Sequence, residues 1–451
     1  MKKELRRGII IYILTWLFII GFFVLAVMYN GGTFKRGLTF FTESFTNISF
    51  LFGCHIFFAL VYLLFLITRY FVRTYRKKGL KLFLKRLSLR LVLPVALIFV
   101  SYKTLVYANG TENYKYDWNA SVENTSGMSK GLFDEDGKHR GMSVFGWRKK
   151  SEADIEQLVA NNIEWVAITP FLYQKDENTS AMNVRDTYDQ WDRRDSSFIA
   201  VIGDLHSRKM KVHLKPHLWM NSGWRSNIQL NSSDEWEGWF DSYEINMLHY
   251  ARMAEATGVS LFCIGTELKT SIQQKPERWK KLIEKIKTLY SGKLTYASNW
   301  DGEFDEISFW DQLDYIGIQA YFPLTQSKNP SLETIQEGWD THIEMLEKLS
   351  QKHRKPILFT EVGYKSEASS TIKPWEWGSF WSIAFTQKSD KTQQLAYEAL
   401  FQKLWHKDWF AGVYIWQWDH RSSKDNVDRN LDFSPRFKPA ENVIAKWFGK
   451  L

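Results

Sequence analysis

The stretch Phe359-Thr360-Glu361-Val362-Gly363-Tyr364 places a carboxylate at the end of an apolar run that begins at Pro356. A second stretch, Leu261-Phe262-Cys263-Ile264-Gly265-Thr266-Glu267, has the same form. Either glutamate alone is explained by a solvated strand end, because Glu side chains are usually exposed. Two such glutamates, each ending one strand of a regular series, indicate a pair of carboxylates that face one cleft. Retaining glycosidases require such a pair.

Strand-like and helix-like segments alternate from residue 139 onward. The candidate strands are Met142–Trp147, Trp165–Phe171, Lys211–Leu218, Ser260–Glu267, Leu294–Trp300, Tyr315–Tyr321, Pro356–Glu361 and Gly412–Trp418. The amphipathic stretches between them include Ser151–Asn161, Phe198–Lys209, Trp239–Thr257, Pro276–Tyr290, Ser331–His353 and Lys391–Trp405. Eight strands with helical crossovers predict an α/β fold, the (β/α)₈ TIM barrel. A doubly wound sheet is disfavoured because no glycine-rich phosphate loop follows the first strand.

The period of two along a strand predicts which side chains share a face with each glutamate. Cys263 and Gly265 are expected to align with Glu267, and Ile357 and Phe359 with Glu361. The same spacing aligns Gln319 with Tyr321, Trp416 with Trp418, and His213 and Lys215 with His217. In a TIM barrel these strand ends carry the chemistry.

Three other kinds of site are disfavoured by the sequence. His213 and His217 would lie about 13 Å apart along one strand, too far to share a metal ion. The sequence contains no Gly-x-Ser-x-Gly motif, which disfavours a serine hydrolase. The only two cysteines, Cys54 and Cys263, lie in different regions, so neither a disulfide nor a Cys metal site is expected.

The positive charge is concentrated in the first 110 residues. The whole chain has a formal net charge of +9, but residues 1–110 hold 16 Lys and Arg against only Glu4 and Glu43. The remainder therefore carries a net charge of −5. A basic excess confined to one end gives no support for nucleic-acid binding.

Three apolar segments in this basic region are long enough to cross a bilayer, and they cover about residues 9–29, 48–72 and 91–108. A cleaved signal peptide is the alternative for the first, but no small-x-small cleavage site follows it. Lys and Arg gather before the first segment and between the second and third, which predicts that both places are cytoplasmic. We therefore expect a multi-pass protein of the bacterial cytoplasmic membrane, with the later domain outside.

Two further stretches precede the barrel: a basic loop within the membrane region, residues 1–110, and the segment that follows this region. Leu80, Leu84, Leu87 and Leu91 recur at helical spacing in the basic loop, which indicates either a helix along anionic lipid headgroups or an extension of a span. Thr111–Lys138 is polar and aperiodic and predicts a linker. The catalytic domain is then residues 139–451.

The region from about 139 to 451 resembles the clan of (β/α)₈ retaining glycosidases, and within it glycoside hydrolase family 113, known for β-1,4-mannan-cleaving enzymes. The resemblance rests on seven short stretches in order along the chain: Gly141-Met142-Ser143, Lys215-Pro216-His217, Gly265-Thr266-Glu267, Ser298-Asn299-Trp300-Asp301, Gln319-Ala320-Tyr321-Phe322-Pro323, Thr360-Glu361-Val362-Gly363-Tyr364 and Trp416-Gln417-Trp418.

The resemblance implies a role for each of several residues. Glu361 would be the nucleophile, and Glu267, kept protonated by burial and by its negative neighbour, the acid/base. Tyr321 would hold Glu361 by a hydrogen bond, and Trp416 or Trp418 would form the floor of the subsite. The residues expected to line the cleft are Lys215, His217, Asn299 and Trp300; a purely structural role at the barrel mouth is the alternative for each.

One position departs from the family pattern. Most of the clan has Asn before the acid/base, where this chain has Thr266. The hydrogen bond to the sugar 2-hydroxyl would then come from another residue, for which Asn299 is the candidate.

The sequence thus predicts a membrane-anchored retaining glycoside hydrolase that acts on β-linked oligo- or polysaccharides, foremost β-1,4-mannan. No cofactor, metal or nucleic acid is expected, the lipid bilayer is an expected partner, and the oligomeric state is not predicted. Two alternatives stay open: a non-catalytic membrane-tethered carbohydrate-binding protein, and a glycosidase that acts on another sugar.

Overall fold

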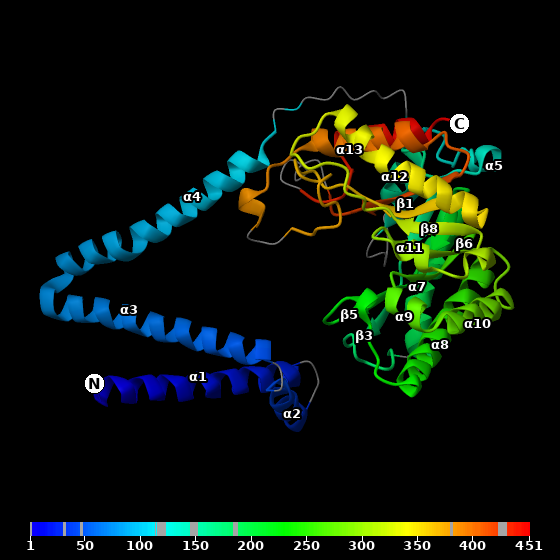
Figure 1. Cartoon of the computed structure of the whole chain (residues 1–451). Coiled ribbons are helices and arrows are strands. Elements are labelled where there is room, and N and C mark those ends of the chain that lie inside the picture. The colour runs from blue at the N-terminus through cyan, green and yellow to red at the C-terminus, as the bar shows by residue number, and fades with distance from the viewer. Residues whose placement is uncertain are drawn as a thin grey trace. The chain divides into compact units, whose positions relative to one another are not determined.

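The computed structural model describes residues 2–29, 33–45, 48–112, 114, 123–144, 152–183, 188–378, 382–422 and 431–451. The chain divides into two compact units, Met1–Thr104 and Leu105–Leu451 (Figure 1). The first unit is entirely helical in its described part, and the second contains the strands.

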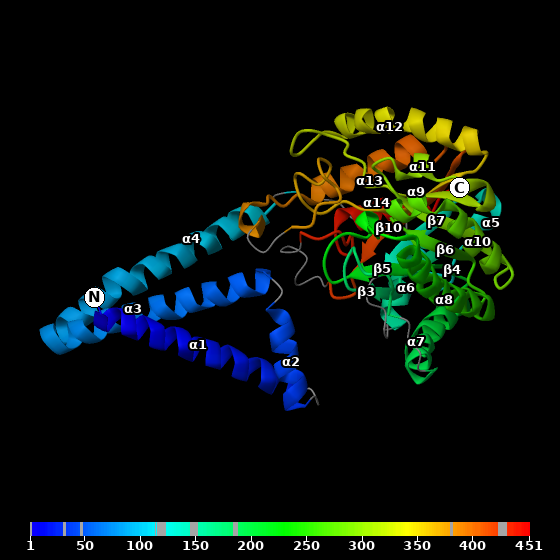
Figure 2. The same ribbon diagram turned by 60° about the horizontal axis from the view of Figure 1, so that its bottom comes forward.

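Eight parallel strands of the second unit form a closed barrel in the order β1-β10-β9-β8-β7-β6-β4-β2 (Figure 2). Their bounds are β1 His139–Val144, β2 Trp165–Ile168, β4 Lys211–Leu214, β6 Leu261–Thr266, β7 Lys293–Asn299, β8 Tyr315–Gln319, β9 Ile357–Val362 and β10 Phe410–Trp418. Each predicted strand overlaps one of these eight, which confirms the predicted TIM barrel. Residues 145–147 of the first predicted strand lie outside the described residues.

The second and third predicted strands are shorter in the barrel than expected. The barrel ladder ends at Ile168 and Leu214, and the chain then forms a separate two-stranded sheet of β3 (Phe171–Gln174) and β5 (His217–Met220). Pro170 and Pro216 stand at the two breaks. Proline has no N–H to donate to a ladder, so neither barrel strand continues through it.

Helices pack around the barrel. They are α5 Phe133–Asp136, α6 Glu152–Ala160, α7 Tyr188–Ser207, α8 Ser233–Thr257, α9 Lys269–Gln274, α10 Pro276–Lys287, α11 Glu303–Glu306, α12 Leu332–His353, α13 Asp390–Leu404 and α14 Pro439–Phe448, with 3₁₀ turns η3 Arg225–Asn227, η4 Trp310–Gln312 and η5 Ser382–Phe385. Local sequence explains their ends: α8 begins with a capping box of Ser232 and Glu235 and stops at Gly258, where φ is 68°. On α10, Trp279, Leu282, Ile283 and Ile286 recur at helical spacing and are all buried.

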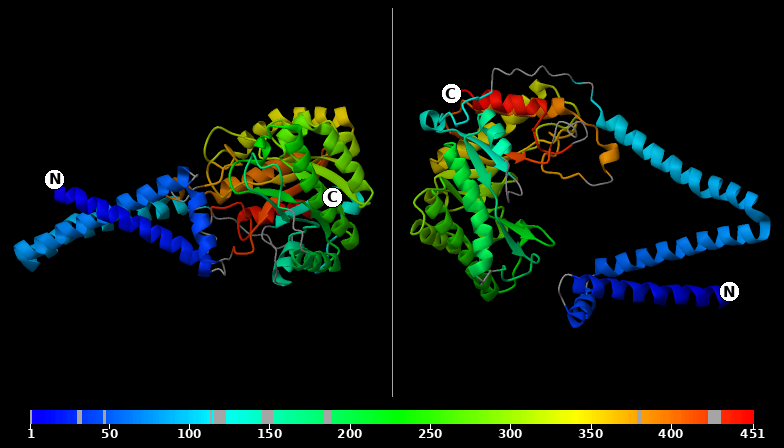
Figure 3. Two further views of the ribbon diagram at one scale, coloured as in Figure 1. Left: turned by 90° about the horizontal axis from the view of Figure 1, so that it is seen from below. Right: turned by 180° about the vertical axis from the view of Figure 1, so that it is seen from behind.

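The first unit consists of α1 Lys2–Tyr29, α2 Phe34–Ser44, α3 Ile48–Leu87, the π-helical turn η1 Ser88–Val92 and the start of α4 Leu93–Gly110 (Figure 3). Two stretches of the described chain, Leu5–Tyr29 and Phe50–Gly110, are long and apolar enough to span a membrane. The sequence predicted three separate spans. The second and third lie instead within the single stretch of 61 residues.

This long stretch bends at one residue, Gly79, whose backbone has φ 75° and ψ 173°. The chain after the bend packs on the chain before it: the ring of Phe83 lies 6.1 Å from that of Phe71 and 5.7 Å from that of Tyr75. The predicted basic loop is therefore helical on both sides of Gly79. Both interpretations, a helix along the headgroups and an extension of a span, agree with this secondary structure.

The described parts of the predicted linker contact the barrel unit. The Glu112 carboxylate accepts a hydrogen bond of 2.5 Å from the Asp390 N–H at the start of α13. The N–H groups of Leu132 and Phe133 donate to the buried Glu164 carboxylate at 2.7 and 2.9 Å. Part of the stretch between 111 and 138 is thus packed structure rather than a free spacer.

A fragment that starts at Lys138 should be less stable than one that starts at Asn109. The shorter fragment loses Asp136, which lies 2.6 Å from the fully buried Arg140, and both donors to Glu164. Leaving such buried groups with fewer partners costs about 1–3 kcal/mol. Thermal unfolding of the two soluble fragments measures the difference.

A fragment from residue 123 serves as the control, because it keeps Asp136, Leu132 and Phe133 but lacks Glu112. It should melt closer to the longer fragment. Equal melting temperatures for the fragments from Asn109 and from Lys138 would show that these contacts do not stabilise the barrel.

Candidate active site

Two buried glutamates lie at the carboxyl ends of the fourth and seventh barrel strands. Glu267 directly follows β6 and Glu361 is the penultimate residue of β9, with 4 % and 5 % of their surfaces exposed. Glu267 has a positive φ of 50°, and its N–H donates to the Ala297 carbonyl of β7 at 2.9 Å. A left-handed backbone is uncommon for glutamate and is found where a site imposes it.

A shift in strand register precedes each glutamate. In β6, Cys263 pairs with Thr295 and Thr266 pairs with Ala297, so β6 holds one residue more than β7 between these two pairs. In β9, one residue more than in β8 lies between Phe359 and Glu361. Such bulges redirect the side chains that follow. The predicted alignment of Phe359 with Glu361 is therefore wrong: the Phe359 ring stacks 5.9 Å from Trp339 of α12.

The same correction holds for Gly265 and Glu267. A Cβ on Gly265 would lie 2.7 Å from the ring of Trp279, a residue of α10, so this position faces the helices. Only glycine lets that tryptophan approach the strand so closely. The bulge then brings Glu267, two residues later, to the barrel mouth.

Three side chains surround the Glu361 carboxylate. The Lys215 Nζ lies 2.5 Å from its Oε1, the Tyr321 hydroxyl donates to its Oε2 at 2.9 Å, and the His217 Nε2 lies 3.5 Å from Oε1. Burial and the charge of Glu361 raise the pKa of Tyr321 well above its usual value, so the phenol keeps its proton. Burial and Lys215 lower the pKa of His217 well below its usual value, so the imidazole is neutral.

Glu267 has a different environment. An Arg225 guanidinium nitrogen contacts its Oε2, and the Ser226 hydroxyl donates to its backbone carbonyl at 2.8 Å. Burial raises the pKa of Glu267, and the charge of Glu361 adds to this, whereas Arg225 and a hydrogen bond from Gln319 act in the opposite direction. The net rise suits a carboxyl that carries a proton for transfer.

A third buried carboxyl, Glu303 of α11, connects two loops of the site. It accepts from the Tyr296 hydroxyl and from the Asn299 N–H, both at 2.6 Å, and the Tyr296 oxygen accepts from the Leu268 N–H at 2.6 Å. Burial raises the pKa of Glu303 to about 8. This chain of bonds holds the turn after Glu267 against the end of β7.

The predicted aromatic residues separate into two environments. Trp416 packs in one cluster with Tyr321 and Phe433, and Trp300 contacts this cluster. Trp418 is fully buried in the main core. Met142 of β1 pairs with Ile415 of β10, and Val144 pairs with Trp418, so β10 holds one extra residue between these pairs. This bulge breaks the alternation that predicted a shared face for Trp416 and Trp418.

The structure therefore brings Lys215, His217 and Tyr321 directly to Glu361. Asn299 lies at the end of β7, and its Oδ1 accepts from the Asp301 N–H at 3.3 Å. Among the described residues, no group of three or more His, Cys, Asp and Glu side chains is arranged to hold a metal ion.

Sequence reasoning missed Arg225, Ser226 and Glu303. Arg225 and Ser226 lie on a short 3₁₀ turn in a loop, and Glu303 on a four-residue helix. Neither element has a periodic pattern. Glu303 follows Asn299-Trp300-Asp301 closely, but only the fold reveals that its carboxyl turns back to Asn299 and Tyr296.

A (β/α)₈ barrel with one buried carboxyl beside Arg225 and another beside Lys215, at the ends of strands four and seven, defines a glycoside hydrolase. The sequence profile of Glycoside Hydrolase Family 113 matches residues 142–438, which is more than half of the chain. The chain belongs to this family. No curated protein matches the sequence.

Solved structures agree with this assignment. A GH113 β-mannanase from Alicyclobacillus acidocaldarius, in complex with ManMIm, is 27 % identical to this chain, with a TM-score of 0.59. The match covers 69 % of this chain and 97 % of the mannanase chain. A GH113 β-1,4-mannanase is 25 % identical with a TM-score of 0.58, covering 68 % and 97 %. The fold of the barrel unit is thus that of these enzymes.

Replacing Arg225 with Gln should move the alkaline limb of kcat/KM to higher pH. The guanidinium lowers the pKa of Glu267, so its loss keeps the carboxyl protonated further into the alkaline range. The pH profile of the hydrolysis of a soluble oligosaccharide measures this limb.

Arg278→Gln is the matched control, because Arg278 pairs with Glu237 and Asp241 on the barrel exterior. That variant should keep the wild-type profile. A limb that stays in place, or moves to lower pH, in Arg225→Gln would contradict the assigned role of Arg225.

Proposed function

We propose that this protein is a membrane-anchored retaining glycoside hydrolase that cleaves β-linked mannan or manno-oligosaccharides with Glu361 as nucleophile and Glu267 as acid/base. The contrast between the two carboxyl environments carries the proposal. Glu361 has donors on both oxygens, from Lys215 and Tyr321, whereas the pKa of Glu267 is raised. A nucleophile must be ionised and a general acid protonated, so each environment fits one role.

In the first step Glu361 attacks the anomeric carbon, and the bond from that carbon to the glycosidic oxygen breaks. Glu267 gives its proton to the departing oxygen, and a covalent glycosyl-enzyme forms. In the second step the Glu267 carboxylate takes a proton from water, whose oxygen attacks the anomeric carbon and releases Glu361. Lys215, Tyr321 and His217 orient Glu361 throughout.

Exposed aromatic rings support a saccharide substrate. Trp219, Trp224, Trp375 and Trp377 have between 39 % and 64 % of their surfaces exposed. All four lie on segments that follow the carboxyl ends of β4 or β9. Flat, rigid aromatic faces give large contact areas to sugar rings at low entropic cost. We assign Trp416 to the floor of the reacting subsite, because it packs with Tyr321, whereas Trp418 lies in the main core.

We also assign two further residues of the binding surface and the mannan specificity. The Trp300 ring stacks 4.6 Å from the partly exposed Trp375, which extends an aromatic surface from the Tyr321 cluster. Asn299 is the amide we assign to the sugar 2-hydroxyl, since Thr266 occupies the usual Asn position. The mannan specificity is supported by the β-mannanases of the same family.

The two catalytic glutamates are tested with alanine variants on an activated aryl β-mannoside. Wild-type protein should cleave it, and manno-oligosaccharides, with retained configuration. Glu361→Ala should lower kcat by several orders of magnitude, because the covalent route is lost. Glu267→Ala should keep more activity, because an activated leaving group needs no proton. Azide should rescue Glu267→Ala with retained configuration and Glu361→Ala, if at all, with inverted configuration.

Glu344→Ala is the control, because Glu344 is an exposed residue of α12 paired with Lys348. It should have wild-type activity. Full turnover by Glu361→Ala would overturn the mechanism. Binding of glycans by the wild type without turnover would favour the carbohydrate-binding alternative, and cleavage of glucan but not mannan would assign another sugar.

The membrane anchor is supported by exposure and by charge. The two long apolar helical stretches bury only 17 % and 6 % of their most apolar windows within the protein. Such exposed leucine and phenylalanine surface is stable in lipid rather than in water. The distribution of Lys and Arg supports a cytoplasmic N-terminus and a cytoplasmic bend at Gly79, with the barrel outside.

Reporter fusions in a bacterial host test this topology. Alkaline phosphatase fused after Leu451 should be active, and a fluorescent protein that matures only in the cytoplasm should stay dark there. The same reporters inserted at Gly79 should give the opposite result. A reversed pattern would place the barrel among cytoplasmic sugars.

A further inference from the structure

The chain around the bend at Gly79 carries a high density of positive charge. Nine Lys and Arg residues lie between Arg69 and Arg90, and the sequence contains no Asp or Glu between Glu43 and Glu112. Carboxylates that could balance these cations are therefore absent from the whole of this sequence stretch. The counter-charge must come from outside the stretch.

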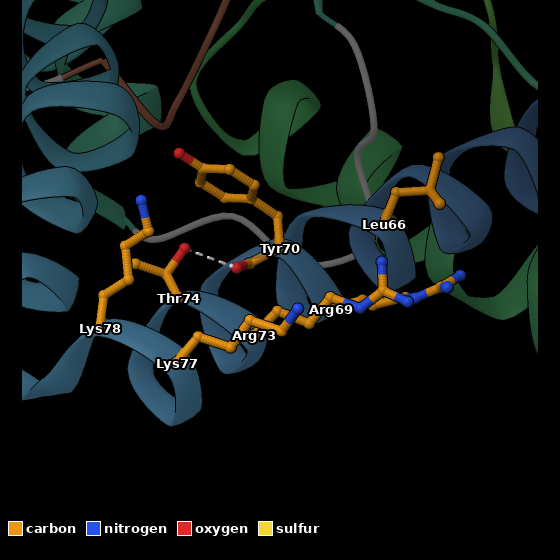
Figure 4. Close-up of a pocket in the computed structure, with 7 residues that line it drawn as sticks. All are labelled: Leu66, Arg69, Tyr70, Arg73, Thr74, Lys77 and Lys78. Carbon is orange, nitrogen blue, oxygen red and sulfur yellow. Dashed lines mark hydrogen bonds between the residues drawn. The ribbon is translucent and has the colours of Figure 1, made fainter.

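Part of this charge lines a groove on α3, which we call the basic groove. Its residues are Leu66, Arg69, Tyr70, Arg73, Thr74, Lys77 and Lys78, and it encloses about 530 Å³. Arg69, Arg73 and Lys77 are spaced four residues apart and follow one edge of the helix, while Tyr70 rises on the other side (Figure 4). The Thr74 hydroxyl donates to the Tyr70 carbonyl at 2.9 Å.

Tyr70 brings two further cations to this place from beyond the bend. Its hydroxyl accepts hydrogen bonds from Arg86 at 3.2 Å and from Arg90 at 2.7 Å. Their guanidinium carbons lie 6.0 and 5.7 Å from the centre of its ring. The Phe83 contacts with Phe71 and Tyr75 fix the two helical legs. Arg86 and Arg90 are thus held by defined contacts, which distinguishes them from charges on a loop.

Apolar side chains lie next to these cations. Leu80 and Leu84, just after the bend, have 58 % and 48 % of their surfaces exposed, and Leu66 lines the groove itself. A small soluble anion would leave these leucines in water. A phospholipid supplies both an anionic phosphate for the cations and acyl chains for the leucines.

We propose that the basic groove binds the phosphate of an anionic phospholipid headgroup in the cytoplasmic leaflet. The proposal rests on the membrane anchoring proposed above and is independent of glycoside cleavage. The shared chemistry is a phosphate group held by guanidinium and ammonium donors.

The test uses the full-length protein, purified in detergent and mixed with equal amounts of phosphatidylglycerol and phosphatidylcholine. Native mass spectrometry then counts the lipids that stay bound. The wild type should retain phosphatidylglycerol in preference. Arg69→Gln/Arg73→Gln/Lys77→Gln should weaken that retention on the order of a hundredfold. Hydrolysis of a soluble oligosaccharide by this variant should equal that of the wild type, which separates lipid binding from catalysis.

A matched variant removes three cations of the same unit outside the groove, Lys35→Gln/Arg36→Gln/Lys103→Gln. It should retain phosphatidylglycerol like the wild type. An equal loss in both triple variants would show that the charge acts diffusely and would overturn the site. The reporter fusions are repeated on both variants, and an inverted topology in the groove variant would overturn the cytoplasmic assignment.

Tyr70→Phe keeps every charge but removes the acceptor shared by Arg86 and Arg90. It should weaken phosphatidylglycerol retention several-fold if the groove is a built site, and unchanged retention would contradict this. Inorganic phosphate, compared with chloride at equal ionic strength, should not displace the lipid. Displacement by phosphate would assign the groove to a soluble phosphate compound and overturn the lipid assignment.

Discussion

The buried ion pair of Lys215 and Glu361 is the interaction on which the active site depends. Both side chains are almost inaccessible to water, and the charged atoms lie 2.5 Å apart. Removing either partner would leave an uncompensated charge inside the barrel, which typically costs about 3–5 kcal/mol. His217, two residues after Lys215, also approaches Glu361, with its Nε2 at 3.5 Å from Oε1.

The same barrel mouth keeps a second carboxyl under opposite conditions. Glu267 is buried beside a negative neighbour, with Arg225 and Gln319 as the opposing influences on its pKa. Glu303 stands behind it and joins Tyr296 to the N–H groups of Leu268 and Asn299. Three carboxyls in one region thus have three environments: Glu361 accepts from strong donors, Glu267 has a raised pKa, and Glu303 bonds to backbone and to a tyrosine.

The eight strands and both glutamates could be predicted because they depend on local sequence. Apolar runs, their spacing and a carboxylate at a strand end are visible without the fold. The strands β6, β9 and β10 each contain an extra residue that the period of two does not predict. The predicted faces of Gly265, Phe359 and Trp418 were therefore wrong. Arg225 and Glu303 could not be predicted, because contacts between distant loops bring them to the site. The bend at Gly79 likewise depends on backbone conformation that hydropathy does not encode.

The two-stranded sheet of β3 and β5 follows the barrel strands at Pro170 and Pro216 and forms no ladder with the barrel. It carries the half-exposed Trp219, whereas Lys215, just before it, contacts Glu361. The sheet therefore extends from His217, which lies 3.5 Å from Glu361, to the half-exposed Trp219 two residues later. Under the proposed function, substitutions at the Trp219 end of this sheet would alter contacts with neighbouring sugar units and leave His217 beside Glu361 unchanged.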